Sequence, residues 1–193
     1  MSRRDTFVKI PKNRIGVLIG PNAGTKKLIE KSLGVQLDID SDDGGVNISL
    51  SPETTDPSTL FRAKEVVLAI GRGFSPEKAR RLLHDEDSLL LIVDLRDYVG
   101  KSDSDIKRLS GRIIGREGRT RRLIEELTDT SVSIFGHTIS IIGTIKEAEI
   151  ARQAIEMFIR GRLHTSVYRF LHAKRRELKK DKMELWKKPY ETT

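Results

Sequence analysis

The sequence has no cysteine, few aromatic residues and no long hydrophobic run. Without cysteine there can be no disulfide, no Cys-ligated zinc and no thiol catalysis. The only soft metal ligands are four scattered histidines, and for this reason we expect no metal site and no cofactor. No apolar run approaches the roughly 20 residues that a membrane span needs, and the N-terminal segment lacks the apolar core of a secretory signal. We therefore expect a cytoplasmic protein.

Basic residues exceed acidic ones, and the excess is concentrated near the end of the chain. The formal net charge is +8, and residues 160–188 hold eleven Lys and Arg against Glu177, Asp181 and Glu184. Such a balance points to a polyanionic partner. We interpret this segment as a basic helix in contact with RNA, with a merely solvated helix as the alternative. Its densest part contains Lys174, Arg175, Arg176, Lys179 and Lys180.

The chain of 193 residues is long enough for two small domains, and an internal repeat supports that division. Residues 24–30 (GTKKLIE) match residues 119–125 (RTRRLIE) at an offset of 95. Further on, residues 63–73 match residues 151–161 at an offset of 88. The second copy therefore has fewer connecting residues between its elements.

Each copy shows the hydrophobic pattern of a β-α-α-β-β-α unit. Alternating apolar residues predict strands, and apolar residues at helical spacing predict helices. The expected strands are 7–10, 35–40 and 46–50 in the first copy and 89–95, 131–135 and 138–142 in the second. Two short helices meet at a glycine loop after Ile19 or Ile114, and a long helix (60–70 or 146–159) closes each unit. We expect an α+β fold in which three helices cover one face of a three-stranded sheet.

Two further helices are expected outside the repeats. Ser75-Pro76-Glu77 has the signature of a helix start, which predicts a linking helix to about His84. After Gly161 the chain can continue as a helix to Trp186. The apolar stripe of this helix would consist of Leu163, Val167, Phe170 and Leu171.

The glycine loop of the second copy carries the most specific motif. It reads Ile114-Gly115-Arg116-Glu117-Gly118 between two short helices, and here the sequence resembles the KH family. The resemblance implies two tandem type I KH domains and a loop that clamps single-stranded RNA, with an apolar groove beside it. Glycine suits both ends of such a loop because a Cβ would obstruct the nucleic-acid backbone.

Charge around this loop is strongly positive. Residues 107–122 contain seven Lys and Arg, and the acidic residue Glu117 lies in the loop itself. The alternative is that the glycines only join two helices and that the arginines are solvated. The predicted RNA-binding residues are Arg112, Ile114, Gly115, Arg116, Glu117, Gly118, Arg119, Arg121, Arg122 and Ile134. Ile113 and Val132 are further groove candidates, and because strand side chains alternate, the sequence does not decide which of the apolar residues face the core.

The first copy departs from this pattern. Its loop reads Gly20-Pro21-Asn22-Ala23, with alanine at the second glycine position, or one residue longer if Gly24 is taken as that glycine. Pro21 also removes a backbone donor. We expect only auxiliary RNA contact here, with a module kept for packing as the alternative. The auxiliary candidates are Lys12, Arg14, Gly20, Asn22, Lys26 and Lys27.

The pairing of a degraded loop with the segment GREGRTRRLIEE resembles the archaeal members of the Dim-two, or partner-of-Nob-one, family. The resemblance implies a non-catalytic factor that binds near the 3′ end of small-subunit (16S) ribosomal RNA, acts in ribosome assembly, and works with the pre-ribosomal small subunit and the endonuclease that trims this RNA. The expected domains are residues 1–73 (KH domain 1), 74–87 (linker), 88–161 (KH domain 2) and 162–193 (basic helix and tail).

Three alternatives remain from the sequence. A KH protein associated with mRNA or translation fits the same motifs. A scaffold that binds protein through its modules and RNA through the tail alone is a second possibility. The third is an NTPase, because residues 20–26 faintly resemble a phosphate loop, although their spacing and the order of Thr25 and Lys26 do not fit one.

Overall fold

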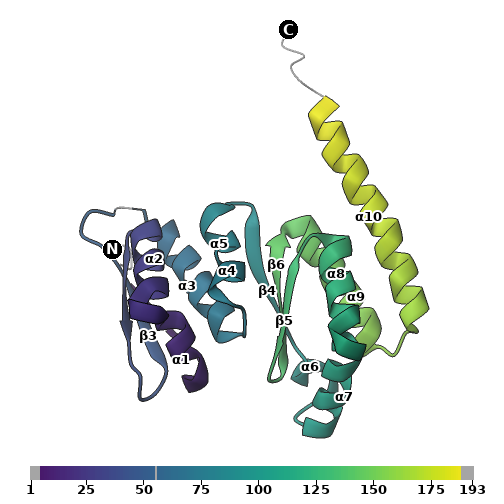
Figure 1. Cartoon of the computed structure of the whole chain (residues 1–193), viewed down its shortest axis with the longest axis horizontal. Coiled ribbons are helices and arrows are strands. Elements are labelled where there is room, and N and C mark those ends of the chain that lie inside the picture. The colour runs from purple at the N-terminus through teal and green to yellow at the C-terminus, as the bar shows by residue number, and fades with distance from the viewer. Residues whose placement is uncertain (1–4, 55, 188–193) are drawn as a thin grey trace.

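The computed structural model describes residues 5–54 and 56–187. The expected first and last domains extend to residues 1 and 193, and their outermost parts, residues 1–4 and 188–193 with Lys188, lie outside the described residues. Two modules of similar architecture lie next to each other, and a long helix runs along the second one (Figure 1). Within the described ranges, no helix combines the length and the apolar character needed to cross a bilayer.

The first module is a three-stranded antiparallel sheet with three helices on one face. Its elements are β1 (Asp5–Lys9), α1 (Lys12–Ile19), α2 (Gly24–Leu33), β2 (Val35–Ile39), β3 (Gly45–Leu50) and α3 (Ser58–Gly71). The strand order is β1-β3-β2, which leaves β2 at an edge. Strand alternation sends Val8, Leu37 and Ile48 into the core beneath the helices. The predicted β-α-α-β-β-α order is confirmed.

The second module repeats this architecture. Its elements are β4 (Ser88–Asp94), α6 (Arg96–Val99), α7 (Asp103–Ile114), α8 (Arg119–Thr128), β5 (Ser131–Phe135), β6 (Thr138–Thr144) and α9 (Ile145–Ile159). The strand order is β4-β6-β5, so β5 holds the place of β2. The short helix α6 was not predicted, and β6 is two residues longer than expected. A capping box begins α9, in which Thr144 and Glu147 exchange side-chain and backbone hydrogen bonds.

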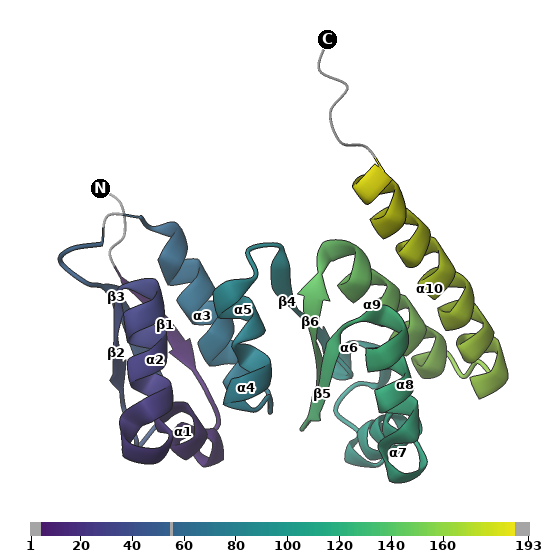
Figure 2. The same ribbon diagram turned by 45° about the horizontal axis from the view of Figure 1, so that its top comes forward.

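The second sheet is also covered on the face opposite its three helices, by a contact between the modules that the sequence did not predict. Residues 138–143 of β6 are all buried. Ile142 belongs to the hydrophobic core of the first module, and Leu90 of β4 packs against the same core. Figure 2 shows the linker helices between the two modules, facing the second sheet. The reason is that the second face of this sheet presents apolar side chains to the first module, so that the two modules form one packed unit.

The linker is divided into two short helices, α4 (Pro76–Ala79) and α5 (Arg81–His84), instead of the single helix that was predicted. The division falls at Arg80, where the Leu83 N–H donates to the Arg80 carbonyl three residues back and the turn tightens. Arg81 ties the linker to the second module. Its guanidinium lies 2.9 Å from Oε2 of the buried Glu147 and donates to the Asp129 carbonyl at 2.6 Å.

The C-terminal helix α10 (His164–Lys187) packs on α8 and α9. Val167 and Leu171 are fully buried in the core of the second module, and Phe170 packs against that core. Leu163, which was predicted to belong to this apolar stripe, is 71% exposed because it precedes the helix in the connecting turn. The first half of α10 is therefore part of the second module, and the C-terminal end of the helix extends beyond this module (Figure 1).

Candidate nucleic-acid interface

The loop of the second module joins α7 to α8 through a single 3-10 turn, Arg116–Gly118. Gly115, Glu117 and Gly118 all have positive φ, at 72°, 53° and 73°. The two glycines meet different requirements. A Cβ on Gly115 would lie 2.2 Å from Oγ1 of Thr120, whereas a Cβ on Gly118 would meet no atom within 4 Å. Gly115 is therefore needed for packing, and Gly118 borders open space that a nucleic-acid backbone can approach.

The structure divides the cations around this loop into two groups. Several already have protein partners: Arg122 donates to the Glu117 carbonyl at 2.9 Å, Arg112 donates to the Arg162 carbonyl, and Arg108 pairs with Asp105 at 3.1 Å. Arg121 lies 3.8 Å from a carboxylate oxygen of Glu125. Arg122 therefore shapes the loop itself.

The second group consists of Lys107, Arg116 and Arg119. All three are exposed, and none forms an ion pair or side-chain hydrogen bond with another described residue. Arg116 belongs to the loop and Arg119 is the first residue of α8. Among the predicted contacts, these cations are the ones whose charge is least neutralised by the protein, and they remain our best candidates for phosphate contact.

The burial pattern decides between the apolar groove candidates. Ile113 and Val132 are fully buried in the core of the second module. Ile114 and Ile134 are only partly buried. Ile114 adjoins the loop, and Ile134 lies on the edge strand β5. Of the four candidates, Ile114 and Ile134 are thus the ones available to line a groove.

A glutamate on the second helix of each pair caps the edge strand, a feature that the sequence analysis missed. Oε1 of Glu125 accepts the backbone N–H of Val132 at 2.9 Å, and Oε1 of Glu30 accepts that of Leu37 at 2.9 Å. The two pairs are related by the offset of 95, so the shared Leu-Ile-Glu segment was the available signal. The carboxylate satisfies a backbone donor that an edge strand would otherwise leave unpaired.

The loop of the first module has the backbone shape of the second loop. The φ and ψ angles of Gly20 are 70° and 175°, against 72° and 175° for Gly115. Ala23 takes the place of Gly118, with a left-handed φ of 59°. The alternative alignment with a longer loop is wrong, because Gly24 is already the first residue of α2 and has ordinary helical angles. The first module has lost the second glycine but has kept the turn.

A hollow beside the second helix of the first module is more acidic than a phosphate-binding surface should be. A pocket of about 540 Å³ lies between α2 and β2, with Glu30 and Asp38 among its lining residues. Lys26 lines it too, and its Nζ lies 3.9 Å from Glu30. At the position of Asp38 the second module has Ser133. Carboxylates here oppose the approach of a polyanion.

Arg14, one of the auxiliary candidates, has a structural role within the protein. Nε of Arg14 donates to the Ile70 carbonyl at 2.8 Å, and Nη2 donates to the Phe74 carbonyl at 2.6 Å. The same guanidinium lies over the ring of Phe135 in the second module, 5.9 Å from the ring centroid. Arg14 thus joins the modules, because carbonyls at and just after the end of α3 accept hydrogen bonds from a guanidinium that also contacts the second module. Lys12, Asn22 and Lys27 are exposed, and Gly20 is half-buried.

Behind the second loop lies a small polar cluster that the sequence analysis also missed. Thr120 is buried, and its Oγ1 lies 3.0 Å from the hydroxyl of Tyr168 on α10. The same hydroxyl lies 3.3 Å from Nδ1 of His164. Burial lowers the pKa of His164, and the positive charge of Arg112 lowers it further. The C-terminal helix therefore supports the residue on which Gly115 rests.

The geometry does not suit nucleotide hydrolysis by a phosphate loop. Such a loop follows a strand and has its lysine directly after the second glycine. Here residues 20–24 follow the helix α1, and Lys26 lies within α2 near Glu30. Among the described residues there is also no group of three or more His, Asp and Glu side chains that would hold a metal ion.

Comparisons with known proteins agree with this architecture. Residues 89–176 match the profile of the eukaryotic type KH domain (KH-domain type I) from the second domain of PNO1 proteins, and residues 8–85 match that of the Krr1 KH1 domain. The chain is 48% identical, over 94% of its length and 79% of the relative's, to a KH domain-containing protein of Methanocaldococcus jannaschii. It is 31% identical to the pre-rRNA-processing protein PNO1 of Phaeosphaeria nodorum, of which it spans 47%.

A solved structure extends the likeness to three dimensions. The chain superposes with a TM-score of 0.84 and 48% identity on a chain from the a/eIF2α–aDim2p–rRNA complex of Pyrococcus horikoshii. The match covers 90% of this chain and 94% of the other. Both modules are therefore included in the similarity.

Proposed function

Because this chain belongs to the Dim2/PNO1 family of proteins with two KH domains, we propose that it binds single-stranded ribosomal RNA through the loop Gly115–Gly118. Relatives in this family are pre-rRNA-processing and RNA-binding proteins, and one related chain was crystallised in a complex with rRNA. RNA binding in rRNA processing is accordingly the function of the chain, and the assignment to particular residues is our proposal.

The observation that carries the proposal is the combination of open backbone and free positive charge at one loop. Gly118 borders empty space, and Arg116 and Arg119 on either side of it are exposed. A phosphate that approaches this turn meets no Cβ and is attracted by two cations. Ile114 and Ile134 supply apolar surface beside the loop, on which bases can lie.

We place the target near the 3′ end of small-subunit rRNA and expect the protein to act with the endonuclease that trims this end and with the pre-ribosomal small subunit. We propose that the chain itself binds the RNA and that the endonuclease carries out the cleavage. Arg176 and Lys179 on the basic second half of α10 are exposed. We propose that these side chains add contacts to RNA that follow the backbone without reading its sequence.

The experiment that tests the proposal places the same charge at equivalent positions of the two loops. Gly118→Asp should weaken binding of a single-stranded RNA from the 3′ end of 16S rRNA by at least about tenfold, because a carboxylate then projects into the open space. Ala23→Asp is the matched control, and we expect a much smaller effect from it. It is a better control than Gly20→Asp, because a side chain at Gly20 would collide with Thr25. Binding is measured by fluorescence anisotropy, and circular dichroism verifies that both variants fold.

Equal losses in the two variants would contradict the assignment of RNA to the second loop. A role in translation or on mRNA is separated by sequencing the RNA that crosslinks to the protein in cells. Fragments from the 3′ end of small-subunit rRNA support the proposal, and a broad set of mRNA fragments favours the other KH function. A scaffold that binds RNA through its tail alone would be insensitive to Gly118→Asp and sensitive to Arg176→Gln with Lys179→Gln.

A further inference from the structure

Two neighbouring hollows lie on a face of the molecule away from α1 and α7. The first, of about 770 Å³, is lined by α2, α3, the end of the linker and the start of β4, and Phe61, Arg62 and Glu65 are among its lining residues. The second, of about 540 Å³, is lined by the start of β4, the junction of β6 with α9, and α10. Glu86, Ser88 and Leu89 line both. In Figure 1 the turn between α5 and β4, which holds Glu86, is at the upper end of the molecule, while α1 and α7 lie toward the lower end.

Two large hydrophobic side chains on this face are exposed. Phe61 is 73% exposed and Ile145 is 70% exposed, and each lines one of the hollows. Leu89 lies between them, and Leu178 of α10 borders the second hollow. Large exposed aromatic and aliphatic side chains beside a hollow are typical of protein-binding surfaces, where such residues act as anchors.

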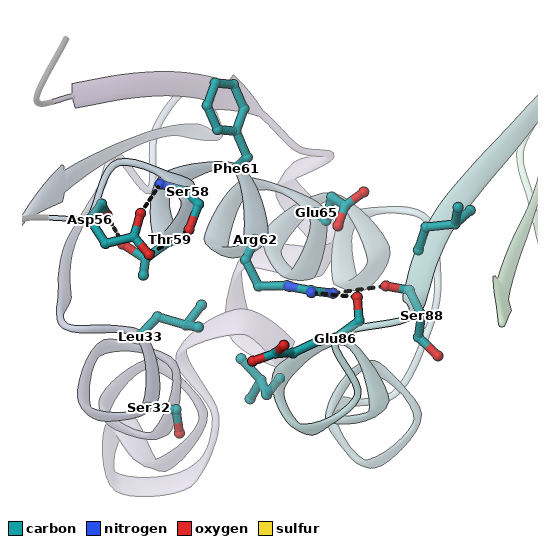
Figure 3. Close-up of a pocket in the computed structure, with 12 residues that line it drawn as sticks. Ser32, Leu33, Asp56, Ser58, Thr59, Phe61, Arg62, Glu65, Glu86 and Ser88 are labelled. Atoms are coloured by element: carbon teal, nitrogen blue, oxygen red, sulfur yellow. Dashed lines mark hydrogen bonds between the residues drawn. The ribbon is translucent and has the colours of Figure 1, made fainter. Parts of the chain in front are cut away.

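The charge of this face is opposite to that of the whole chain. The exposed Glu86 lines both hollows, and the exposed Asp87 lines the second. Asp56 and Glu65 also line the first hollow, and Asp181 lines the second. The two cations that line the hollows are already engaged: Arg62 donates to the carbonyls of Asp85, Glu86 and Ser88, and Nζ of Lys146 lies 3.2 Å from Asp181. Figure 3 shows Arg62 reaching across the first hollow to Glu86 and Ser88. A face of this charge repels RNA and attracts cationic groups.

We propose that this face, formed by Phe61, Glu65, residues 86–89 and Ile145, is the docking surface for a segment of a protein partner in which Lys or Arg side chains alternate with apolar ones. The apolar side chains of the partner fill the two hollows against Phe61 and Ile145, and its cations meet Glu86, Asp87 and Glu65. Partial burial raises the pKa of Glu65, while a hydrogen bond from the Leu90 backbone and the nearby charge of Arg62 act in the opposite direction. This inference goes beyond RNA binding, since it assigns a second partner of a different class.

A second copy of the chain is a poor fit to the same face. In a symmetric dimer the same acidic patch would lie on both sides of the interface, so that carboxylates of one copy would oppose carboxylates of the other. Like charges opposed across an interface disfavour association. The position of the face also leaves the loop Gly115–Gly118 uncovered, so that RNA and the partner segment can bind together.

The test uses the full chain and a short fluorescent peptide in which Leu and Lys alternate, with a peptide of alternating Leu and Glu as the control. We expect the Leu-Lys peptide to bind with micromolar affinity and the Leu-Glu peptide not to bind. Glu86→Lys with Asp87→Lys should reduce the affinity at least about tenfold, and so should Phe61→Ser with Ile145→Ser. All four substituted side chains are exposed, and the variants should therefore fold. NMR shifts of labelled protein should map the peptide to residues 61, 65, 86–89 and 145.

Several outcomes would overturn the inference. These are an absence of binding at millimolar peptide, equal binding of the two peptides, and NMR shifts at residues 115–118 in place of the docking face. If the protein self-associates and Phe61→Ser abolishes this, the occupant is a second copy of the chain. If RNA shifts the NMR signals of residues 61, 65, 86–89 and 145, the occupant is RNA. The variant Glu86→Lys with Asp87→Lys should keep its affinity for RNA in the absence of peptide. The RNA-binding assay thus tests the proposed role of Gly118, and the peptide-binding assay tests the docking face separately.

Discussion

The hydroxyl of Tyr168 lies 3.0 Å from Oγ1 of Thr120, and this contact connects the C-terminal helix to the RNA loop. Thr120 is buried directly beneath Gly115, where a Cβ on the glycine would lie 2.2 Å from Oγ1. The first module has the same arrangement of Gly20 over Thr25, but α10 packs on the second module and not on the first. The loop with the intact glycine pair is therefore also the loop that the C-terminal helix supports.

Tyr168→Phe removes the hydroxyl and leaves the ring, which packs edge-on against Phe158. We expect the free energy of unfolding to fall by about 1 kcal/mol, the usual contribution of one hydrogen bond. We also expect RNA affinity to fall by roughly fivefold, because Thr120 loses the partner that fixes it below the loop. Tyr98→Phe is the matched control, since the hydroxyl of Tyr98 contacts Glu156, a residue of α9. If Tyr98→Phe lowered RNA affinity as much, the effect would not depend on the loop.

The stability of the protein should fall on mild acidification through His164. Burial and the nearby charge of Arg112 lower the pKa of this histidine below its ordinary value of 6.5. The unfolded chain therefore takes up a proton at a higher pH than the folded one does, and the stabilisation is present above the unfolded pKa and lost as pH falls. Thermal unfolding at about pH 7.5 and about pH 5.5 measures the loss. It should be smaller in His164→Gln and unchanged in the exposed control His172→Gln.

Ala23→Gly should stabilise the first module. Ala23 has a left-handed φ of 59°, which is unfavourable for a residue with a Cβ. We expect the free energy of unfolding to rise by about 0.5–1 kcal/mol. This gain is the strain energy that the substitution relieves, reduced by the entropic cost of the more flexible glycine in the unfolded chain. Gly118→Ala makes the reverse change in the second loop and should cost a similar amount. Chemical denaturation of both variants measures the two values, and a loss of stability in Ala23→Gly would contradict the argument.

Arg116→Ala should weaken RNA binding and reduce its dependence on salt. Each phosphate contact to a single strand contributes about 0.7 to the slope of log affinity against log salt concentration. We expect the slope to fall by about that amount in Arg116→Ala. Arg108→Ala is the control, because Arg108 is already paired with Asp105, and its slope should change less. An unchanged slope in Arg116→Ala would place the Arg116 side chain away from phosphate.

Arg81→Ala should loosen the contact between the linker and the second module. The side chain of Glu147 is only 3% exposed, and Arg81 provides its opposite charge at 2.9 Å. Removal of one partner from a buried ion pair costs about 3 kcal/mol, which urea denaturation would detect. The double variant Arg81→Ala with Glu147→Gln should lose less than the two single variants together, because it leaves no buried charge. Additive losses would show that the pair is not coupled.

Much of the local structure was predictable from the sequence because hydrophobic spacing and glycine positions report it directly. The repeat at an offset of 95 predicted the order of elements, and the loop Gly115–Gly118 was recognisable as a KH loop. Boundaries were less certain, since the linker divides at Arg80 and Leu163 lies outside the helix that its spacing suggested. These details depend on hydrogen bonds and packing that a single window of sequence does not contain.

The order of amino acids alone reveals two copies of one unit, a full glycine pair only in the second copy, and an excess of positive charge in residues 160–188. Which of these features serve the site depends on how the chain folds. The tertiary structure turned Arg14 toward carbonyls at the end of α3, buried Val167 and Leu171 of the basic helix, and placed Tyr168 under the loop. The physical reason is that a charge or an apolar residue acts through its neighbours in space, and these come from segments far apart in the chain.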